Sequence, residues 1–227
     1  MPNLTLNFRP ESLGAGTPVN IYLPDVIAED MPVLYLLHGM HGDHNSWING
    51  SSIGRYARAR GLAVIMPSVG NSFYANQKHG CRYFDYVAHE LPEYIGKLLP
   101  FITKKREKTF VAGLSMGGLE TMESFMAYPA MFGYINVMSS GWFANNREMY
   151  ANGEKRLNEI AATLNKTAKL LLFTQGGPED IAYNNGKEML KVFDKCGIKY
   201  EFSEMPGGHS WHVWRHDLHN LAPRLFK

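Results

Sequence analysis

A serine framed by two glycines is the first feature of this chain with an evident chemical use. Ser115 stands in Gly113-Leu114-Ser115-Met116-Gly117, directly after the apolar run 109–112 and before a helical pattern. In a strand-turn-helix setting this G-x-S-x-G motif lifts the hydroxyl above a sheet, since glycines permit a tight turn that flanking side chains would block. We therefore predict that Ser115 is a nucleophile suited to acyl transfer.

A serine hydroxyl is a weak nucleophile at neutral pH and needs a histidine as general base, supplied by a later loop. The chain contains nine histidines. His209 follows Gly207 and Gly208 and lies between the last predicted strand and the last predicted helix. This chain order is the one that such a site requires, so we predict His209 as the base.

Further histidines continue at helical spacing after His209, namely His212, His216 and His219, and could suggest a metal site. No carboxylate or cysteine cluster accompanies them, and a half-buried helix face explains the pattern as well. His41-Gly42-Asp43-His44 could also be taken for a metal cluster, but we expect this loop to serve an oxyanion hole. We predict neither a metal nor another cofactor.

The third member of the site should be an acid that orients the histidine. The loop after the apolar run 170–173 offers two, because Glu179 and Asp180 follow a Gly-Gly-Pro turn. We favour Asp180, which lies at the start of the following helical pattern, and keep Glu179 as the alternative. Asp194 lies among helix-patterned residues and is interpreted as a solvated charge.

Acyl transfer also needs two amide donors for the oxyanion. The Met116 amide begins the helix after the serine, where the helix dipole favours negative charge. The second donor should come from the loop after the run 33–37, and we choose the Met40 amide over that of Gly39. His38 and His41 are expected to pack or to hydrogen-bond this loop.

Aromatic residues gather on the same loops, and ligand pockets are mostly apolar. We take Trp47, Trp142 and Trp211, together with Gly39, as candidate substrate-binding residues. Each tryptophan could equally be ordinary core.

The elements that must position these groups alternate along the chain. Near-continuous apolar runs, typical of parallel strands covered on both faces, occur at 33–37, 62–66, 109–112, 134–138 and 170–173. Two short segments at 4–8 and 19–23 suit antiparallel strands, and the alternating segment 200–204 suits a sheet edge. Helical patterns occupy 86–99, 118–128, 184–196 and 211–221. This order predicts a single α/β domain over residues 1–227, built on a mostly parallel, doubly wound sheet.

The polar segment 142–167 is longer than a simple crossover connection needs, so we expect a small insertion there. The formal net charge of +2 gives no reason to expect nucleic acid as a partner, and Lys104 to Lys108 is interpreted as a solvated connection. Only two cysteines occur, without a C-x-x-C pair, and no apolar run is long enough to span a membrane. We expect a cytoplasmic protein with a small-molecule substrate; a homo-oligomer remains open.

Four stretches of the chain resemble the bacterial tributyrin esterases of the esterase D group. They are Tyr35 to Gly42 with Asn45 to Trp47, Lys105 to Gly118, Gly177 to Asp180, and Gly207 to Trp211. The resemblance implies the α/β-hydrolase fold and a serine carboxylesterase acting on short acyl groups, including acetylated or feruloylated carbohydrate. It carries the triad onto Ser115, Asp180 and His209, and the oxyanion donors onto Met40 and Met116.

Three alternatives stay open beside this reading. A thioesterase such as S-formylglutathione hydrolase and an acyltransferase share the fold that the resemblance implies. A catalytically silent protein of this fold would be a binding module, but such a module has no need for serine, acid and histidine together.

Overall fold

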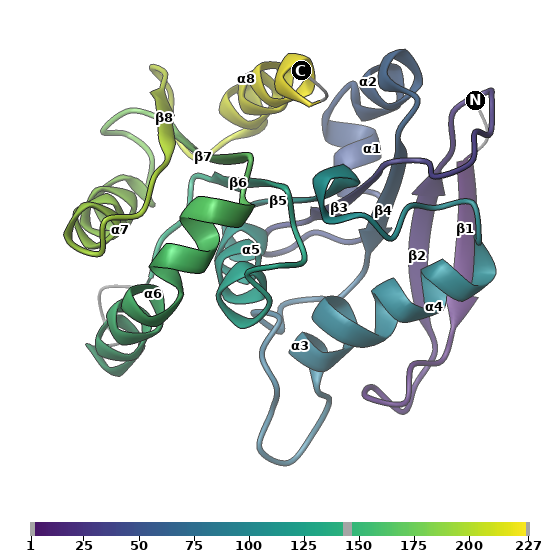
Figure 1. Ribbon diagram of the computed structural model, residues 1–227, viewed down its shortest axis with the longest axis horizontal. Coiled ribbons are helices and arrows are strands. Elements are labelled where there is room, and N and C mark those ends of the chain that lie inside the picture. The colour runs from purple at the N-terminus through teal and green to yellow at the C-terminus, as the bar shows by residue number, and fades with distance from the viewer. Residues whose placement is uncertain (1–2, 143–146, 226–227) are drawn as a thin grey trace.

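One eight-stranded sheet organises the part of the chain that the computed structural model describes, residues 3–142 and 147–225 (Figure 1). The strands follow the order β1-β2-β4-β3-β5-β6-β7-β8, with β3 to β8 parallel and β1 and β2 antiparallel. Their bounds are β1 Asn3–Phe8, β2 Thr17–Tyr22, β3 Val33–Leu37, β4 Ala63–Pro67, β5 Thr109–Leu114, β6 Tyr134–Met138, β7 Leu170–Gln175 and β8 Glu201–Glu204. The predicted mostly parallel sheet with antiparallel N-terminal strands is confirmed.

Helices cover both faces of the sheet. One face carries α1 (Ser46–Gly50), α2 (Ile53–Arg60) and α8 (Trp211–Leu221), and the other carries α4 (Leu91–Leu98), α5 (Met116–Ala127), α6 (Arg147–Thr167) and α7 (Tyr183–Lys195) (Figure 1). Two short 3₁₀ turns lie at Arg106–Lys108 and Ala222–Arg224. Within the described ranges, none of the helices has the length and apolarity needed to cross a bilayer.

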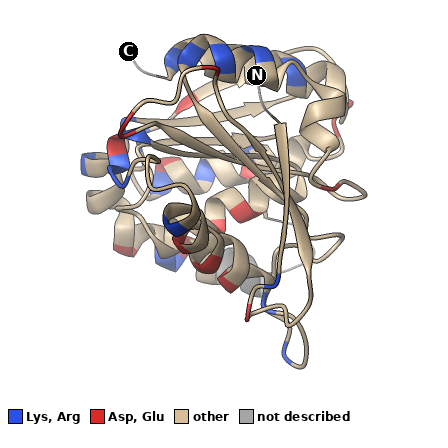
Figure 2. Ribbon diagram, turned by 90° about the vertical axis from the view of Figure 1, so that its right-hand side faces the viewer, with Lys and Arg blue, Asp and Glu red and all other residues tan. Residues whose placement is uncertain are grey.

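The core divides along the two faces of the strands. In β3, Val33, Tyr35 and Leu37 face one helix layer while Leu34 and Leu36 face the other. This alternation follows from the two-residue period of a strand, and burial on both sides explains why the strand reads as one continuous apolar run. The central strands β3 to β7 contain no charged residue, and Figure 2 shows the Lys, Arg, Asp and Glu positions mainly on helices and connections.

The helix predicted over 86–99 is divided in the structure. A short turn of α3 (Tyr83–Asp85) leads into a π-helical segment, Tyr86–Glu90, and α4 begins at Leu91. Pro92 lies in the first turn of α4 and has no N–H to donate to the preceding turn. A wider π turn just before the proline accommodates this missing hydrogen bond.

The segment predicted as an insertion at 142–167 is mostly the single helix α6, which connects the parallel strands β6 and β7. Residues 143–146 lie outside the described part. The helix buries Gly153, Leu157 and Leu164 on one side, a spacing of four and seven residues that the surrounding polar residues obscure in the sequence. Its polar face holds an ion pair of 2.6 Å between Arg156 and Glu123. The segment is therefore a packed crossover helix rather than an added element.

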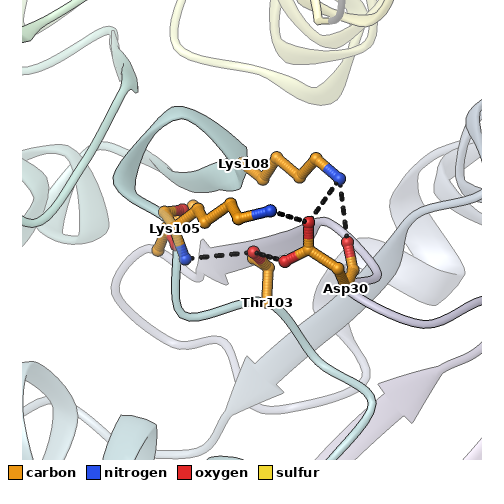
Figure 3. Close-up of polar contacts among 5 residues, drawn as sticks. Asp30, Thr103, Lys105 and Lys108 are labelled. Carbon is orange, nitrogen blue, oxygen red and sulfur yellow. Dashed lines mark hydrogen bonds and ion pairs between the residues drawn. The ribbon is translucent and has the colours of Figure 1, made fainter.

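The basic segment before β5 is anchored to the start of β3 rather than simply solvated (Figure 3). The Asp30 carboxylate lies 2.8 Å from Lys105 Nζ and 2.7 Å from Lys108 Nζ, and it accepts a 2.7 Å hydrogen bond from the Thr103 hydroxyl. Hydrogen bonds from Lys105, Lys108 and Thr103 hold the pKa of Asp30 well below its ordinary value. The cluster joins the amino ends of two adjacent strands, opposite the edge that carries Ser115.

Candidate active site

Ser115 occupies the turn between β5 and α5 with φ of 52° and ψ of −116°, a left-handed conformation that is costly for a residue with a side chain. The flanking glycines make the turn possible. A Cβ on Gly117 would lie 2.6 Å from the Leu37 carbonyl oxygen, and one on Gly113 would lie 2.3 Å from the Gly117 oxygen. Such a strained residue at the edge of a rigid sheet is typical of a functional site.

His209 brings the predicted residues together. Its Nε2 lies 2.8 Å from the Ser115 hydroxyl oxygen, and its Nδ1 lies 2.7 Å from Asp180 Oδ1. The carboxylate can only accept, so Nδ1 carries the proton and Nε2 is free to accept the serine proton. The His209 ring forms a T-shaped contact with Trp214, with 5.0 Å between the ring centroids and an interplanar angle of 90°. Residues 94 positions apart thus form one hydrogen-bonded series.

Asp180 is held rigidly in the loop after β7. It is 3% exposed, and the Ala182 N–H donates to its Oδ1 at 2.8 Å while the Gly176 N–H donates to Oδ2 at 3.3 Å. Burial raises the pKa of this carboxyl, but the hydrogen bonds from His209 and Ala182 outweigh it and leave the pKa below its ordinary value. Glu179, the alternative acid, is exposed, and the structure places Asp180 against His209.

The loop after β3, predicted to supply an oxyanion donor, approaches the serine closely. A Cβ on Gly39 would lie 2.4 Å from Leu114 Cδ1 and 3.4 Å from Ser115 Cβ, so the loop backbone packs against the turn. Met40 follows with 43% of its surface exposed. Met116 is the first residue of α5, where amides have no acceptor within the helix. Both predicted donors therefore belong to segments that border Ser115.

The three candidate tryptophans do not line the pocket beside the serine. Trp47 is 1% exposed, donates through Nε1 to the Leu37 carbonyl at 3.0 Å and meets Trp211 edge-on at 5.2 Å. Trp211 packs against Gly50, where a Cβ would lie 2.4 Å from its ring. Trp142 is fully buried under α6, against Gly153. Their large apolar surfaces instead pack beneath the loops at the carboxyl edge of the sheet.

A small pocket opens at Ser115 and His209 with a volume of about 140 Å³. Its other lining residues were not singled out from the sequence: Ser139, Ser140, Gly141, Ile181, Ala182 and Asn185. All of them follow the carboxyl ends of β6 and β7, which is where ligands bind in open parallel sheets. Chain position is the one signal that could have found them.

Among the residues that the structure describes, no three histidine, cysteine or acidic side chains gather as metal ligands would. His219, one of the helical histidines, has its Nδ1 3.1 Å from the Tyr56 hydroxyl.

Serine hydrolases of the α/β-hydrolase class carry nucleophile, acid and histidine in this chain order at the carboxyl edge of such a sheet, and this protein is of that class. The chain belongs to the esterase family described as "Putative esterase", whose family model matches residues 11–225. It is thus a carboxylic ester hydrolase, as the sequence resemblance implies.

Three relatives illustrate the similarity. An acetyl esterase of Caldicellulosiruptor saccharolyticus is 27% identical and aligns with 100% of this chain and 99% of its own length. The solved structure of a fluorophosphonate-binding serine hydrolase F of Staphylococcus aureus is 25% identical, with a TM-score of 0.89 over 100% of this chain and 98% of that one. An S-formylglutathione hydrolase of the same organism is 25% identical, with a TM-score of 0.84 over 100% and 99%.

A second buried acid lies near Asp180. Asp217 of α8 is 1% exposed, and its Oδ2 has no hydrogen-bond partner among the described residues. Burial raises the pKa of this carboxyl to about 7; the Thr174 hydroxyl lowers it and the Asp180 charge raises it. Near neutral pH, Asp217 is therefore partly protonated, whereas an exposed aspartate would be fully ionised.

This shift predicts a pH-dependent stability. Because the folded-state pKa is raised, the contribution of Asp217 is fully present below about pH 4 and is lost as the pH rises through about 7. We expect Asp217→Asn to gain up to about 4 kcal/mol relative to the parent between pH 4 and pH 8. Urea unfolding of both proteins across this range measures the difference. If the free energy of unfolding changes with pH in the same way in both proteins, the pKa of Asp217 is not raised.

Proposed function

We propose that this protein hydrolyses esters of short-chain carboxylic acids, with Ser115 as nucleophile, His209 as general base and Asp180 as the acid that orients it. The observation that carries the proposal is the continuous series of hydrogen bonds from Ser115 through His209 to Asp180, at 2.8 and 2.7 Å. Such a series activates a hydroxyl that is otherwise protonated and unreactive at neutral pH.

The reaction follows from these positions. Ser115 Oγ attacks the ester carbonyl while its proton passes to His209 Nε2, and the amides of Met40 and Met116 stabilise the resulting oxyanion. Collapse of this intermediate breaks the bond to the alcohol oxygen, which leaves with the proton from His209. Water then attacks the acyl-enzyme with His209 again as base, and the bond to Ser115 Oγ breaks as His209 returns the proton to this oxygen, so that the carboxylic acid departs. Asp180 stays ionised throughout and stabilises the imidazolium.

The pocket at Ser115 supports a short acyl group. Its volume of about 140 Å³ is well below the usual range of about 300–1,000 Å³ for ligand pockets. Acetyl to butyryl groups suit a space of this size. Ile181 is 81% exposed at this pocket, so the site is open to solvent and a larger alcohol moiety can extend outward.

The pocket predicts how acyl specificity responds to its walls. Ala182 lines the pocket, while its amide N–H holds Asp180 and is unaffected by a change of side chain. Ala182→Val should lower kcat/KM for p-nitrophenyl butyrate at least about tenfold more than for the acetate, since methyl groups added to a wall of a small pocket cost about 1–3 kcal/mol. Initial rates on the acetate-to-octanoate series measure this ratio.

The opposite substitution serves as the matched control. Ala182→Gly enlarges the same wall and should shift the preference toward butyrate and hexanoate. If neither variant changes the ratio between acetate and butyrate, this pocket does not receive the acyl group.

The S-formylglutathione hydrolase of Staphylococcus aureus, with its TM-score of 0.84, favours a thioester as a second candidate substrate. The ratio of thioester to ester rates for one acyl group distinguishes the two. Product analysis with an added alcohol acceptor separates hydrolysis from acyl transfer. A protein that turns over none of these substrates would be a binding module instead. The cytoplasmic location and a homo-oligomeric state remain predictions.

A further inference from the structure

His38 lies directly beneath the proposed oxyanion loop, and both nitrogens of its ring are engaged. The side chain is 1% exposed. Its Nδ1 lies 2.7 Å from the Gly39 carbonyl oxygen, and its Nε2 lies 3.2 Å from the backbone nitrogen of Val69. The ring therefore links the loop after β3 to the loop after β4.

These two partners determine the tautomer of the ring. A carbonyl oxygen can only accept, so Nδ1 must carry a proton; a backbone N–H can only donate, so Nε2 must be unprotonated. Burial lowers the pKa of His38 and keeps the ring neutral, although the hydrogen bond to Gly39 acts in the opposite direction. His38 is consequently a fixed donor toward Gly39.

The orientation of the Gly39 carbonyl fixes that of the Met40 amide. The two groups belong to one planar peptide, which is trans, so that they point in opposite directions. The Gly39 oxygen accepts from the His38 ring and also from the Gly42 N–H at 3.2 Å. As long as these bonds hold the oxygen inward, the Met40 N–H is directed away from the His38 ring.

Neighbouring groups hold the rest of the loop in the same arrangement. The Tyr74 hydroxyl donates to the His38 carbonyl oxygen at 3.0 Å. Tyr74 is fully buried and has a φ of 56°, next to Phe73 at 52°, so a strained turn is maintained at this contact. Gly39 itself packs against Ser115 on the other side. The peptide that offers Met40 N–H is thus clamped beside the nucleophile.

We propose that His38 is a positioning residue for the oxyanion hole: its Nδ1–H holds the Gly39 carbonyl and thereby aims the Met40 N–H at the developing oxyanion. The inference rests on the proposed function, since it assigns Met40 as a donor. Without this bond the Gly39–Met40 peptide can rotate, and the site then loses a donor in the transition state while substrate binding persists.

Two polar substitutions separate the donor from a general packing role. In His38→Asn the side-chain amide nitrogen can replace Nδ1 as donor to Gly39, whereas His38→Gln reaches the Nε2 position and can accept from Val69 only. We expect His38→Asn to keep kcat for p-nitrophenyl acetate within about tenfold of the parent, and His38→Gln to lose about 10²- to 10³-fold in kcat with little change in KM. An alkyl boronic acid forms a tetrahedral adduct with serine and so resembles the transition state. Its inhibition constant should rise in His38→Gln by the same factor by which kcat/KM falls.

The outcomes are decisive in both directions. If both variants lose kcat equally, or if the loss follows their melting temperatures, His38 is structural and the inference is wrong. If His38→Gln keeps the parent kcat while Ser115→Ala is inactive, only this inference fails. Activity in Ser115→Ala would instead overturn the proposed function itself.

A measurement on the unaltered protein covers the case in which the variants do not fold. Nitrogen-15 NMR of histidine-labelled protein, with the His38 ring assigned through its contact with the Val69 amide, should show the Nδ1–H tautomer. The Nε2–H tautomer or a charged ring at neutral pH would exclude the proposed hydrogen bond to Gly39 and overturn the inference.

Discussion

Ser115→Ala should lower kcat for p-nitrophenyl acetate by about 10⁶-fold, the loss seen when a triad nucleophile is removed elsewhere. In the proposed mechanism the hydroxyl oxygen of Ser115 is the atom that forms the acyl-enzyme. His209 Nε2 points at this oxygen from 2.8 Å and would be left facing a methyl group. The measurement is the initial rate after subtraction of spontaneous hydrolysis.

Removal of the hydroxyl should leave the fold intact, because the backbone of Ser115 holds the turn through its N–H bond to the Met138 carbonyl at 2.9 Å. Alanine keeps the same Cβ at this left-handed position. Ser203→Ala, on the edge strand β8, is a matched control and should retain full activity. A folded Ser115→Ala protein with more than a small fraction of the parent rate would sink the nucleophile assignment.

Asp180→Asn should produce the second large loss, about 10⁴-fold in kcat, as is typical when a triad acid becomes an amide. The asparagine side chain can donate to His209 Nδ1 and so stabilises the wrong tautomer, with the proton on Nε2. Since hydrogen bonds hold the pKa of Asp180 below its ordinary value, the parent acid is ionised across the neutral range. The loss should therefore persist from pH 6 to pH 8.

Glu179→Gln is the control that the sequence itself suggests, because it alters the adjacent acid in the same way. Glu179 is exposed, and we expect near-parental kcat for this variant. Steady-state rates for the two variants decide which acid orients His209. A larger loss in Glu179→Gln than in Asp180→Asn would reverse the assignment.

Much of the fold could be predicted because the central strands are near-continuous apolar runs that stand out in the sequence. Strands 33–37 and 134–138 and the helix 211–221 agree with β3, β6 and α8 to the residue. Burial on both faces makes such strands continuously apolar, and the glycine-rich loops at their carboxyl ends carry the chemistry. The proposed nucleophile, base and acid could be chosen from the sequence for the same reason, since the sheet constrains their order along the chain.

The parts that the sequence obscured depend on tertiary contacts. The sequence predicts an insertion where α6 lies because the buried stripe of this helix is narrow, with Leu157 and Leu164 among polar residues. The sequence leaves the candidate tryptophans open between substrate contact and core, because nothing in a sequence distinguishes a buried indole from one that lines a pocket. The properties of Asp217 and His38 depend on their burial and on the groups around them, which the sequence does not give.

The central claim is that Ser115 is the group that takes up the acyl chain, and a fluorophosphonate probe tests it most directly. Treatment of the protein with the probe, followed by mass spectrometry of its peptides, should find one phosphonyl group per chain. We expect it on the peptide containing Ser115, with esterase activity falling in proportion to the labelling and no labelling of Ser115→Ala. Full esterase activity in a completely labelled protein, or a label on another residue, would contradict the account.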